Sequence, residues 1–341
     1  MTEPILSVRD LHCHFPVRGA FGRQVGAIRA LDGISFELMP GEILGLVGES
    51  GCGKSTLGKT IMGIQPPTGG GITFEGAEIA GASPRAAKDR RARLQYAYQD
   101  PGASLDPRWR IGRSLEEPLI IHTALGAAER REKVRDILAA VGLPLTHLER
   151  YPHEISGGQQ RRVGLARILM LNPKVVILDE PTSGLDVSVQ ATVLSLFRDL
   201  REAFDLTYMF ISHDLSVVRM MCHRVAVMYL GRIVEIGPTQ EIFAAPKHPY
   251  TQSLLAAIPR IGGARVVDTF WLKGEPPDAS RLPTGCRFQG RCPHTTARCL
   301  SEDPALRAVG DQRAACHFAG EVSPPGPAPK SSPTPSRRAL P

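Results

Sequence analysis

The chain has 341 residues, enough for one large domain or two ordinary ones, and its 42% hydrophobic and 22% charged residues are typical of globular proteins. The N-terminal sequence MTEPILSVRD has no basic segment followed by an apolar one, and no apolar run approaches the ~18 residues of a membrane span, so we expect neither a secretory signal nor a transmembrane helix. The net charge of the chain is +7. The densest basic cluster, residues 84–93, has no interleaved aromatic residues, which argues against nucleic acid as a partner.

Short strand-like runs alternate with helical stretches from Ile5 to about Ala245. Residues 129–143 and 187–204 repeat apolar positions at helical spacing. The strand-like runs, several of them apolar throughout as buried strands are, read ILSV, ISFEL, EILGLVG, VVILDE, YMFISHD and VAVMYL. This alternation predicts an α/β fold with a mainly parallel sheet. The segment from about 100 to 172 lacks strong strand signals and is predicted to be a helical insertion.

The composition changes after Ala245. Residues 248–259 read as one short helix ended by proline, and a loop-rich segment with several cysteines follows. The last stretch is rich in proline and serine and is predicted to be disordered. We therefore expect a first domain over 1–245, a C-terminal extension over 246–320 and a disordered tail over 321–341.

The segment GESGCGKST fits the phosphate-binding pattern G-x-x-x-x-G-K-[ST] between an apolar strand and a helical stretch. Glycines let successive N–H groups turn inward around phosphate oxygens. Lys54 is expected to reach the β- and γ-phosphates of ATP, and the Ser55 hydroxyl to hold Mg²⁺. The predicted nucleotide-binding residues of this loop are Gly48, Glu49, Ser50, Gly51, Cys52, Gly53, Lys54, Ser55 and Thr56.

Two acidic residues follow the strand VVIL and complete a hydrolytic site. Asp179 can hold Mg²⁺ through its water shell, and Glu180 can orient and deprotonate the attacking water. His213, after the strand YMFIS, can donate to the γ-phosphate, although a histidine at a strand end is more often a polar loop residue.

A second glycine-rich segment, Ser156-Gly157-Gly158-Gln159, opens a helical stretch farther along the chain. Backbone N–H groups at a helix N-terminus, with Ser156 as the capping residue, form another anion site. A single chain with one P-loop then has two phosphate-binding elements.

In this order and spacing, GESGCGKST, the glutamine of YAYQDP, ISGGQQ, VILDEPTSGLD and the histidine of ISHD closely resemble the ATPase subunits of ABC transporters over about residues 5–245. The resemblance implies a P-loop NTPase fold of ABC type, with an antiparallel β subdomain and an inserted helical subdomain. It implies that Gln99 approaches Mg²⁺ and the attacking water, and that Phe15 stacks on adenine, with Phe21 nearby as an alternative. Asp186 matches an aspartate at the dimer interface. Ile155 departs from the usual leucine of the signature.

The resemblance also accounts for the two phosphate-binding elements. In the family, Ser156-Gly157-Gly158-Gln159 of one subunit would cover the γ-phosphate that is bound on the P-loop of the other. Two chains must therefore pair head to tail around ATP.

Four further segments, residues 99–108, 151–162, 247–259 and 272–293, resemble the ATPase subunits of dipeptide and oligopeptide importers. Residues 15–36 and 66–74 look like the second, F-type, of the two paired ATPases. This implies a heterodimer with a sister ATPase, two transmembrane permease subunits and an extracytoplasmic substrate-binding protein. The chain would lie at the cytoplasmic face of the cell membrane and contact it through the permeases only. Import of nickel or another small solute, and a soluble ABC ATPase without a transport role, remain alternatives.

Four of the seven cysteines lie in the C-terminal extension: Cys286, Cys292, Cys299 and Cys316. This segment has few apolar residues, and a bound metal can replace a missing core. The spacings lack the paired C-x₂-C of usual zinc sites, whereas a Cys₄ iron–sulfur cluster tolerates irregular spacing. The resemblance to peptide-importer ATPases implies a [4Fe–4S] cluster, while zinc and unligated thiols remain open.

Overall fold

The computed structural model describes residues 3–19, 23–81, 90–98, 101–258 and 274–321. Gln99, Phe21 and, apart from Glu321, the predicted disordered tail lie outside the described residues. Within these ranges, no helix has the length and apolar character that crossing a membrane requires.

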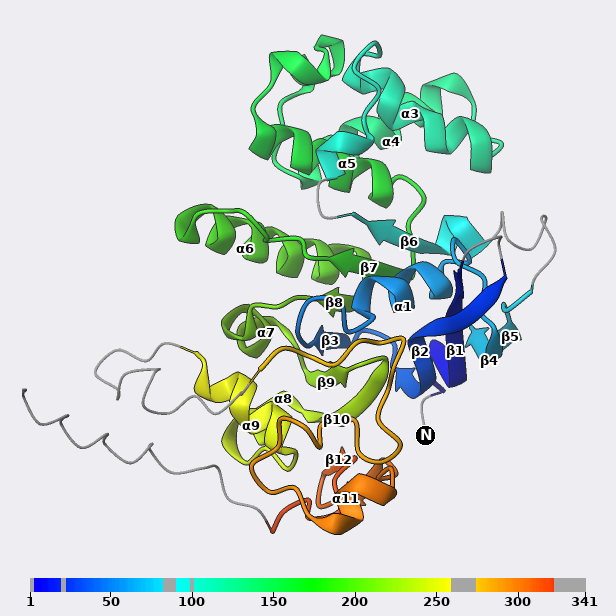
Figure 1. The fold of residues 1–341 in the computed structure, drawn as a ribbon. Helices are drawn as coiled ribbons and strands as arrows, with labels where there is room; N and C mark the ends of the chain where they lie inside the picture. Colours follow the sequence, from blue (N-terminus) through cyan, green and yellow to red (C-terminus); the bar gives the residue numbers. More distant parts are fainter. Residues whose placement is uncertain (1–2, 20–22, 82–89, 99–100, 259–273, 322–341) are drawn as a thin grey trace, which may run out of the picture.

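The larger of two sheets has the strand order β11-β12-β10-β9-β3-β8-β7-β6 in the described part of the chain (Figure 1). The pairs from β6 to β9 are parallel and the pairs beyond β9 are antiparallel, which confirms a mainly parallel sheet. Its strands are β3 (Ile43–Val47), β6 (Leu94–Ala97), β7 (Val175–Asp179), β8 (Thr207–Ile211), β9 (Arg224–Tyr229), β10 (Arg232–Pro238), β11 (Arg307–Val309) and β12 (Gln312–Ala314).

Both faces of this sheet are buried at its central strands, and alternate residues of these strands face different cores. In β7, Val176 and Leu178 pack into one hydrophobic cluster, while Val175 and Ile177 pack into the other. This is why the strands are apolar throughout rather than alternating.

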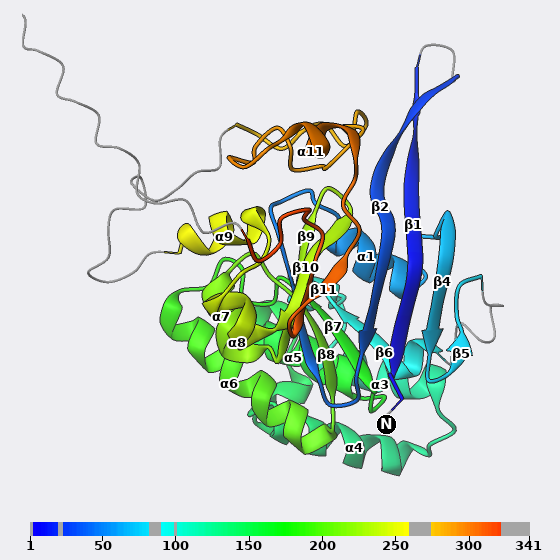
Figure 2. The same ribbon diagram turned by 90° about the horizontal axis from the view of Figure 1, so that it is seen from below.

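The smaller sheet is antiparallel and has the order β2-β1-β4-β5. It consists of β1 (Leu6–Arg18), β2 (Gln24–Leu38), β4 (Gly69–Phe74) and β5 (Ala77–Glu78), and Figure 2 shows β1 and β2 as a long two-stranded ribbon. Helix α1 (Lys54–Ile61) carries Leu57 and Ile61 into the core that the two sheets share. This confirms the predicted antiparallel β subdomain.

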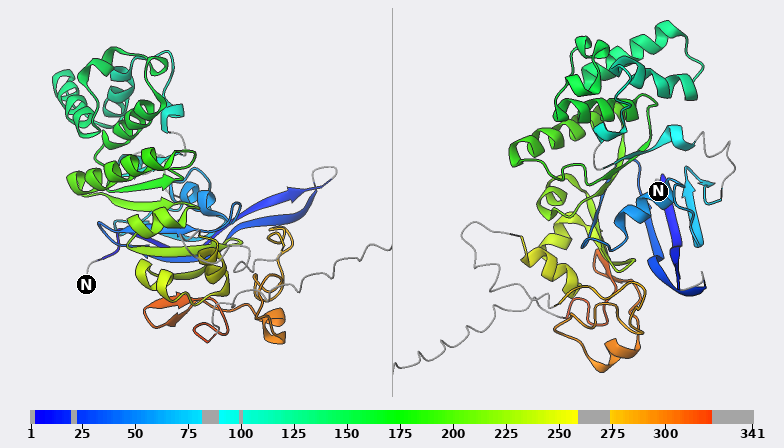
Figure 3. Two further views of the ribbon diagram at one scale, coloured as in Figure 1. Left: turned by 90° about the vertical axis from the view of Figure 1, so that its left-hand side faces the viewer. Right: turned by 45° about the horizontal axis from the view of Figure 1, so that its top comes forward.

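The described elements between β6 and β7 are all helical and lie at one end of the molecule (Figure 3). They are α3 (Ile111–His122), α4 (Ala127–Ala140) and α5 (Gly157–Leu169), with 3₁₀ turns η2 (Pro101–Ser104), η3 (Leu145–Glu149) and η4 (Pro152–Glu154). The predicted inserted helical subdomain is therefore present. Helix α6 (Val187–Phe204) follows β7, and α7 (Leu215–Met221) follows β8.

The C-terminal extension continues the larger sheet. After α8 (Thr239–Ala244) and α9 (Pro249–Ala256), the described chain resumes at residue 274 and forms α11 (Ala297–Ser301) and the β11–β12 hairpin. Strand β12 pairs with β10, with Glu235 opposite Ala314 and Ile236 opposite Arg313. The extension is thus joined to the nucleotide-binding region through backbone hydrogen bonds.

Candidate nucleotide-binding site

A cavity of about 430 Å³ lies where β3 leads into α1. The P-loop forms its floor, and Glu180 and His213 reach it from the ends of β7 and β8. The remaining lining residues come from β2, the β9–β10 turn and the extension: Ile28, Arg29, Ala30, Gly231 and Ala279, together with Ser183.

Two glycines make the P-loop conformation possible. Gly48 and Gly53 have φ values of 150° and 109°, in the region that favours glycine. A Cβ atom would lie 2.2 Å from the Met228 carbonyl oxygen at Gly48, and 2.3 Å from that of Ala30 at Gly53. The loop can pack this closely on its neighbours only because these positions have no side chain.

Lys54 is buried at the first position of α1. Its Nζ donates to the carbonyl oxygens of Gly48 at 2.7 Å and Glu49 at 3.0 Å. The ammonium group is therefore fixed at the loop, where its charge can attract the phosphates of a nucleotide.

Two hydroxyl groups hold the carboxylate of Asp179. Ser55 Oγ donates to Oδ1 at 3.1 Å, and the Tyr96 hydroxyl donates to Oδ2 at 2.5 Å. Burial raises the pKa of Tyr96, and the adjacent carboxylate raises it further, so this hydroxyl remains a donor. No local sequence pattern predicts this contact of Tyr96. It arises from the parallel pairing of β6 with β7, which brings Tyr96 beside Ile177 and near the end of β7.

Glu180 and His213 lie together because β7 and β8 are parallel neighbours. His213 Nδ1 and Glu180 Oε2 are 2.6 Å apart. Glu180 has a φ of 53°, a strained conformation for a residue other than glycine, and its N–H donates to the Ile211 carbonyl at 3.0 Å. The strained backbone directs the carboxylate into the pocket beside His213.

Ser156 caps helix α5 through a reciprocal pair of hydrogen bonds with Gln159. Gly157 and Gly158 are exposed, and a Cβ at either would have no atom within 4 Å. Among the described residues, those that line the pocket include none of this segment, so the capped helix end is not part of the pocket of its own chain. The departure from the signature, Ile155, is buried in the core.

Three further residues were predicted to contact the nucleotide, Mg²⁺ or the partner subunit: Asp186, Phe15 and Gln99. Asp186 is the exposed N-cap residue of α6. Phe15 packs against the core and does not line the pocket, whereas its cross-strand partner Ile28 does. Gln99 lies outside the described residues, and its position relative to Asp179 stays a prediction.

The extension cysteines line one small cavity. Cys286, Cys292, Cys299 and Cys316 share it with Phe288, Phe318 and three histidines, His248, His294 and His317.

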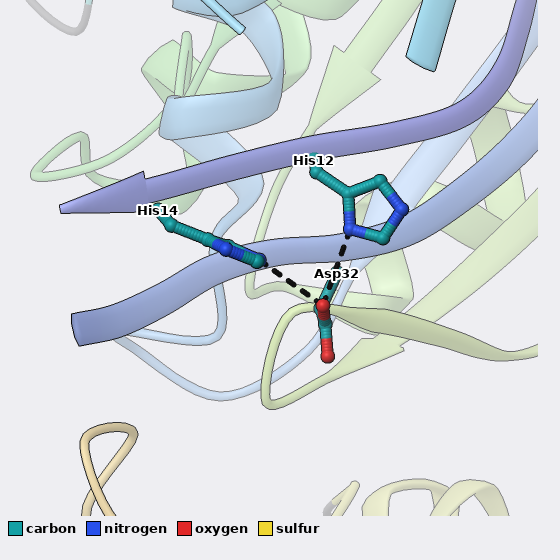
Figure 4. A group of neighbouring side chains, drawn as sticks. All are labelled: His12, His14 and Asp32. Atoms are coloured by element: carbon teal, nitrogen blue, oxygen red, sulfur yellow. Dashed lines mark hydrogen bonds and ion pairs between the residues drawn. The ribbon is translucent and has the colours of Figure 1, made fainter. Parts of the chain in front are cut away.

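Figure 4 shows a separate polar group, in which both His12 Nδ1 and His14 Nε2 contact Asp32 Oδ1, at 3.2 and 3.1 Å. The ligand atoms of these three residues lie within 4.8 Å of one another. Asp32 also accepts from Arg287 and lies 3.8 Å from Arg232. Burial by itself raises the pKa of Asp32, but its hydrogen bonds with Arg287 and His14 and the charge of Arg232 outweigh it and lower the pKa to about 2. These guanidinium groups disfavour a bound cation, so we interpret the group as a structural anchor.

Two family models match the chain. Residues 31–183 match the model described as ABC transporter, and residues 234–299 match the C-terminal region of oligopeptide/dipeptide transporters.

Two solved ATP-binding cassettes are similar in structure. A dimeric cassette in a post-hydrolysis state with ADP and Pi bound has a TM-score of 0.60 at 26% identity and covers 69% of this chain and 98% of that one. The cbiO1 protein of Clostridium perfringens has a TM-score of 0.62 at 30% identity and covers 71% and 92%. The predicted ABC-type fold is thereby confirmed.

Curated relatives match nearly the whole chain. The di/tripeptide transport ATP-binding protein DppF of Pseudomonas aeruginosa is 48% identical and covers 93% of this chain and 98% of its own. The dipeptide transport protein DppF of Escherichia coli is 47% identical, with coverage of 93% and 95%. The oligopeptide transport protein AppF of Bacillus subtilis is also 47% identical, with coverage of 93% and 98%. The chain therefore belongs to the ABC transporter family, in the group of dipeptide and oligopeptide transport ATP-binding proteins.

Proposed function

We propose that this chain hydrolyses ATP to power the import of dipeptides and oligopeptides across the cell membrane through partner permease subunits. The observation that carries the proposal is the combination, in one chain, of a P-loop pocket with an oligopeptide/dipeptide transporter C-terminal region. The relatives that match over almost their full length are named for peptide transport. None of those three names supports the nickel alternative.

We propose the following roles for the side chains of the site. Lys54 would bind the β- and γ-phosphates, and Ser55 and Asp179, with Gln99, would hold Mg²⁺, which neutralises phosphate charge. Glu180 would accept a proton from the water that attacks the γ-phosphorus, while the bond to ADP breaks. In this structure, His213 contacts Glu180. When ATP is bound, the His213 side chain would turn and donate a hydrogen bond to the γ-phosphate.

The second phosphate-binding element, residues 156–159, supports a dimer of ATPase subunits. Ser156, Gly158 and Gln159 lie at an exposed helix end that does not line the pocket of the same chain, so this helix end is free to cover the nucleotide of a partner. Asp186 would contact the partner at the same interface. We propose a heterodimer with a sister ATPase, because the chain is similar to the F-type member of a pair.

We also propose the domain boundaries, the other subunits of the complex and its location. The nucleotide-binding domain would cover residues 1–245 and the extension residues 246–320, with the tail at 321–341. The complex would contain two permeases and receive peptides from an extracytoplasmic substrate-binding protein. The chain would therefore lie at the cytoplasmic face of the membrane.

A transport assay tests this function directly. The chain is co-purified with its permeases and sister ATPase, reconstituted into vesicles with its binding protein, and supplied with labelled dipeptide or with nickel. We expect ATP-dependent uptake of the peptide and none of nickel. Uptake of nickel alone, or ATP hydrolysis that no peptide stimulates, would contradict the peptide assignment.

We also propose that the extension cysteines bind a [4Fe–4S] cluster. Zinc lies about 2.3 Å from each thiolate, which brings four sulfurs to about 3.8 Å from one another. In the described chain, the group of possible ligand atoms that lie within 4.8 Å of one another is that of His12, His14 and Asp32, and it contains none of these cysteines. A cluster binds each cysteine through a different iron and suits sulfurs that are farther apart around one cavity.

Cys292→Ser should remove the visible absorbance of protein purified without oxygen and loosen the extension, because one cluster ligand is lost. Absorbance, iron content and limited proteolysis measure both effects. Cys222→Ala is the control, because this buried thiol does not line the cysteine cavity. The Cys222→Ala protein should keep the visible absorbance of the wild type. A colourless wild-type protein with stoichiometric zinc, or without metal, would rule the cluster out.

A further inference from the structure

The C-terminal extension contacts the P-loop at Glu49. Arg291 donates to both carboxylate oxygens of Glu49, through Nη1 to Oε2 at 2.6 Å and through Nη2 to Oε1 at 2.9 Å. The Tyr250 hydroxyl accepts the Glu49 N–H at 2.8 Å. The Glu49 carbonyl oxygen in turn accepts from Lys54 Nζ at 3.0 Å. Three polar groups of Glu49 are therefore held, two of them by the extension.

The ion pair is partly removed from water. The Arg291 side chain is 6% exposed and that of Glu49 is 25% exposed. The hydrogen bonds to Glu49 raise the pKa of Arg291, although burial acts against them. Arg291 also lies over the Tyr229 ring, 5.8 Å from its centroid. A bidentate pair that is partly shielded from water restrains the geometry of both partners more strongly than a single contact at the surface does.

An aromatic cluster fills the space between Glu49 and the cysteine cavity. Tyr229 and Tyr250 have ring centroids 4.7 Å apart, and Phe288 lies 5.4 Å from the first and 5.5 Å from the second. All three side chains are buried, and Phe288 also lines the cysteine cavity. The contact at Glu49 is thus continuous with the core of the extension.

Two further contacts join the extension to the walls of the nucleotide pocket. Arg287 donates to Asp32 of β2 and to the Leu230 carbonyl, in the turn that lines the pocket at Gly231. Ala279 lines the pocket itself, and its carbonyl oxygen accepts from the Arg29 N–H at 3.4 Å.

We propose that Arg291 and Tyr250 are positioning residues for ATP, which act by holding Glu49 and with it the P-loop backbone. The proposal rests on the function proposed above, since it concerns the same pocket. Arg291 neutralises and restrains the Glu49 carboxylate, which would otherwise be an unpaired charge next to the P-loop. Tyr250 accepts from the N–H of the Gly48–Glu49 peptide, and the carbonyl oxygen of that peptide, Gly48 O, accepts from Lys54 Nζ at 2.7 Å. The extension is then part of the nucleotide site as well as a family-specific appendage.

Arg291→Met removes the positive charge and both hydrogen bonds to Glu49 but keeps most of the apolar volume of the side chain. We expect the Kd for ATP, measured by equilibrium binding to the full chain, to rise about tenfold. Tyr250→Phe removes one oxygen atom and should raise the Kd less. In the assembled complex, the KM for ATP should rise while kcat stays near wild type, because the chemical groups are untouched.

A double-mutant cycle separates positioning from a general loss of stability. In a Glu49→Gln background, Arg291→Met should change the Kd much less, since no carboxylate needs neutralising. Arg298→Met is the control: Arg298 pairs with Glu302 in the same extension, but both are more than half exposed, and ATP binding should not change.

The outcomes are distinguishable from a failure of the proposed function. If the wild-type chain binds no ATP, the proposed function fails. If the wild type binds ATP and folded Arg291→Met and Tyr250→Phe proteins bind it equally well, the positioning role is refuted. Should Arg291→Met not fold, Arg291→Lys and Tyr250→Phe replace it, and unchanged Kd values in both would refute the proposal in the same way.

Discussion

Glu180→Gln is expected to lower steady-state ATP turnover by at least about 100-fold while ATP binding is retained. Glu180 is the carboxylate that reaches the pocket beside His213, and its strained backbone at a φ of 53° aims it there. Glutamine has nearly the same shape but cannot accept the proton of the attacking water. The ATP-bound state should therefore accumulate, and the dimer should remain closed.

Phosphate release by the assembled complex measures turnover, and nucleotide retention after gel filtration measures binding. Glu202→Gln is the matched control, because Glu202 is exposed on α6, away from the pocket, and its turnover should equal that of the wild type. Turnover of Glu180→Gln within a few-fold of wild type would mean that another group accepts the proton.

The sequence predicts best where a local pattern and the tertiary environment agree. The range 187–204 was predicted as a helix from its apolar spacing, and α6 spans these residues. The central strands were readable because each is buried on both faces and is apolar throughout. Strand β6 was missed, because its four residues, LQYA, are too few to establish a period and Gln95 interrupts the apolar run.

The parts of the site that the sequence did not reveal depend on distant partners. Arg291 contacts Glu49 across 242 positions of the chain, and nothing in the local sequence of either residue indicates the other. The hairpin of β11 and β12 was predicted as loop because each strand has three residues. The hairpin is joined to the sheet through the pairing of β12 with β10. The P-loop pattern and the acidic pair after a strand predicted the roles of Lys54 and Glu180, but not the groups that contact them, which are the Gly48 and Glu49 carbonyl oxygens and His213.

The second large effect is expected from Gly158→Asp, which tests the composite site. The added side chain has room in the single chain, because a Cβ at Gly158 would have no atom within 4 Å, and the backbone there does not require glycine. In a head-to-tail dimer, however, the new carboxylate would face the γ-phosphate of the partner's ATP. Charge repulsion and bulk should then prevent closure and reduce ATP turnover by roughly 100-fold.

The paired measurements distinguish an effect across the interface from one within the chain. Isolated Gly158→Asp protein should melt at the wild-type temperature and bind ATP on its own P-loop, while the assembled complex loses turnover and peptide uptake. Gly158→Ala adds a methyl group without charge, so a smaller loss of turnover would assign most of the effect to repulsion. If isolated Gly158→Asp protein fails to bind ATP although it is folded, the signature segment acts on its own pocket, and the head-to-tail arrangement is wrong for this chain. If the complex of Gly158→Asp keeps full turnover, no phosphate approaches Gly158 during hydrolysis.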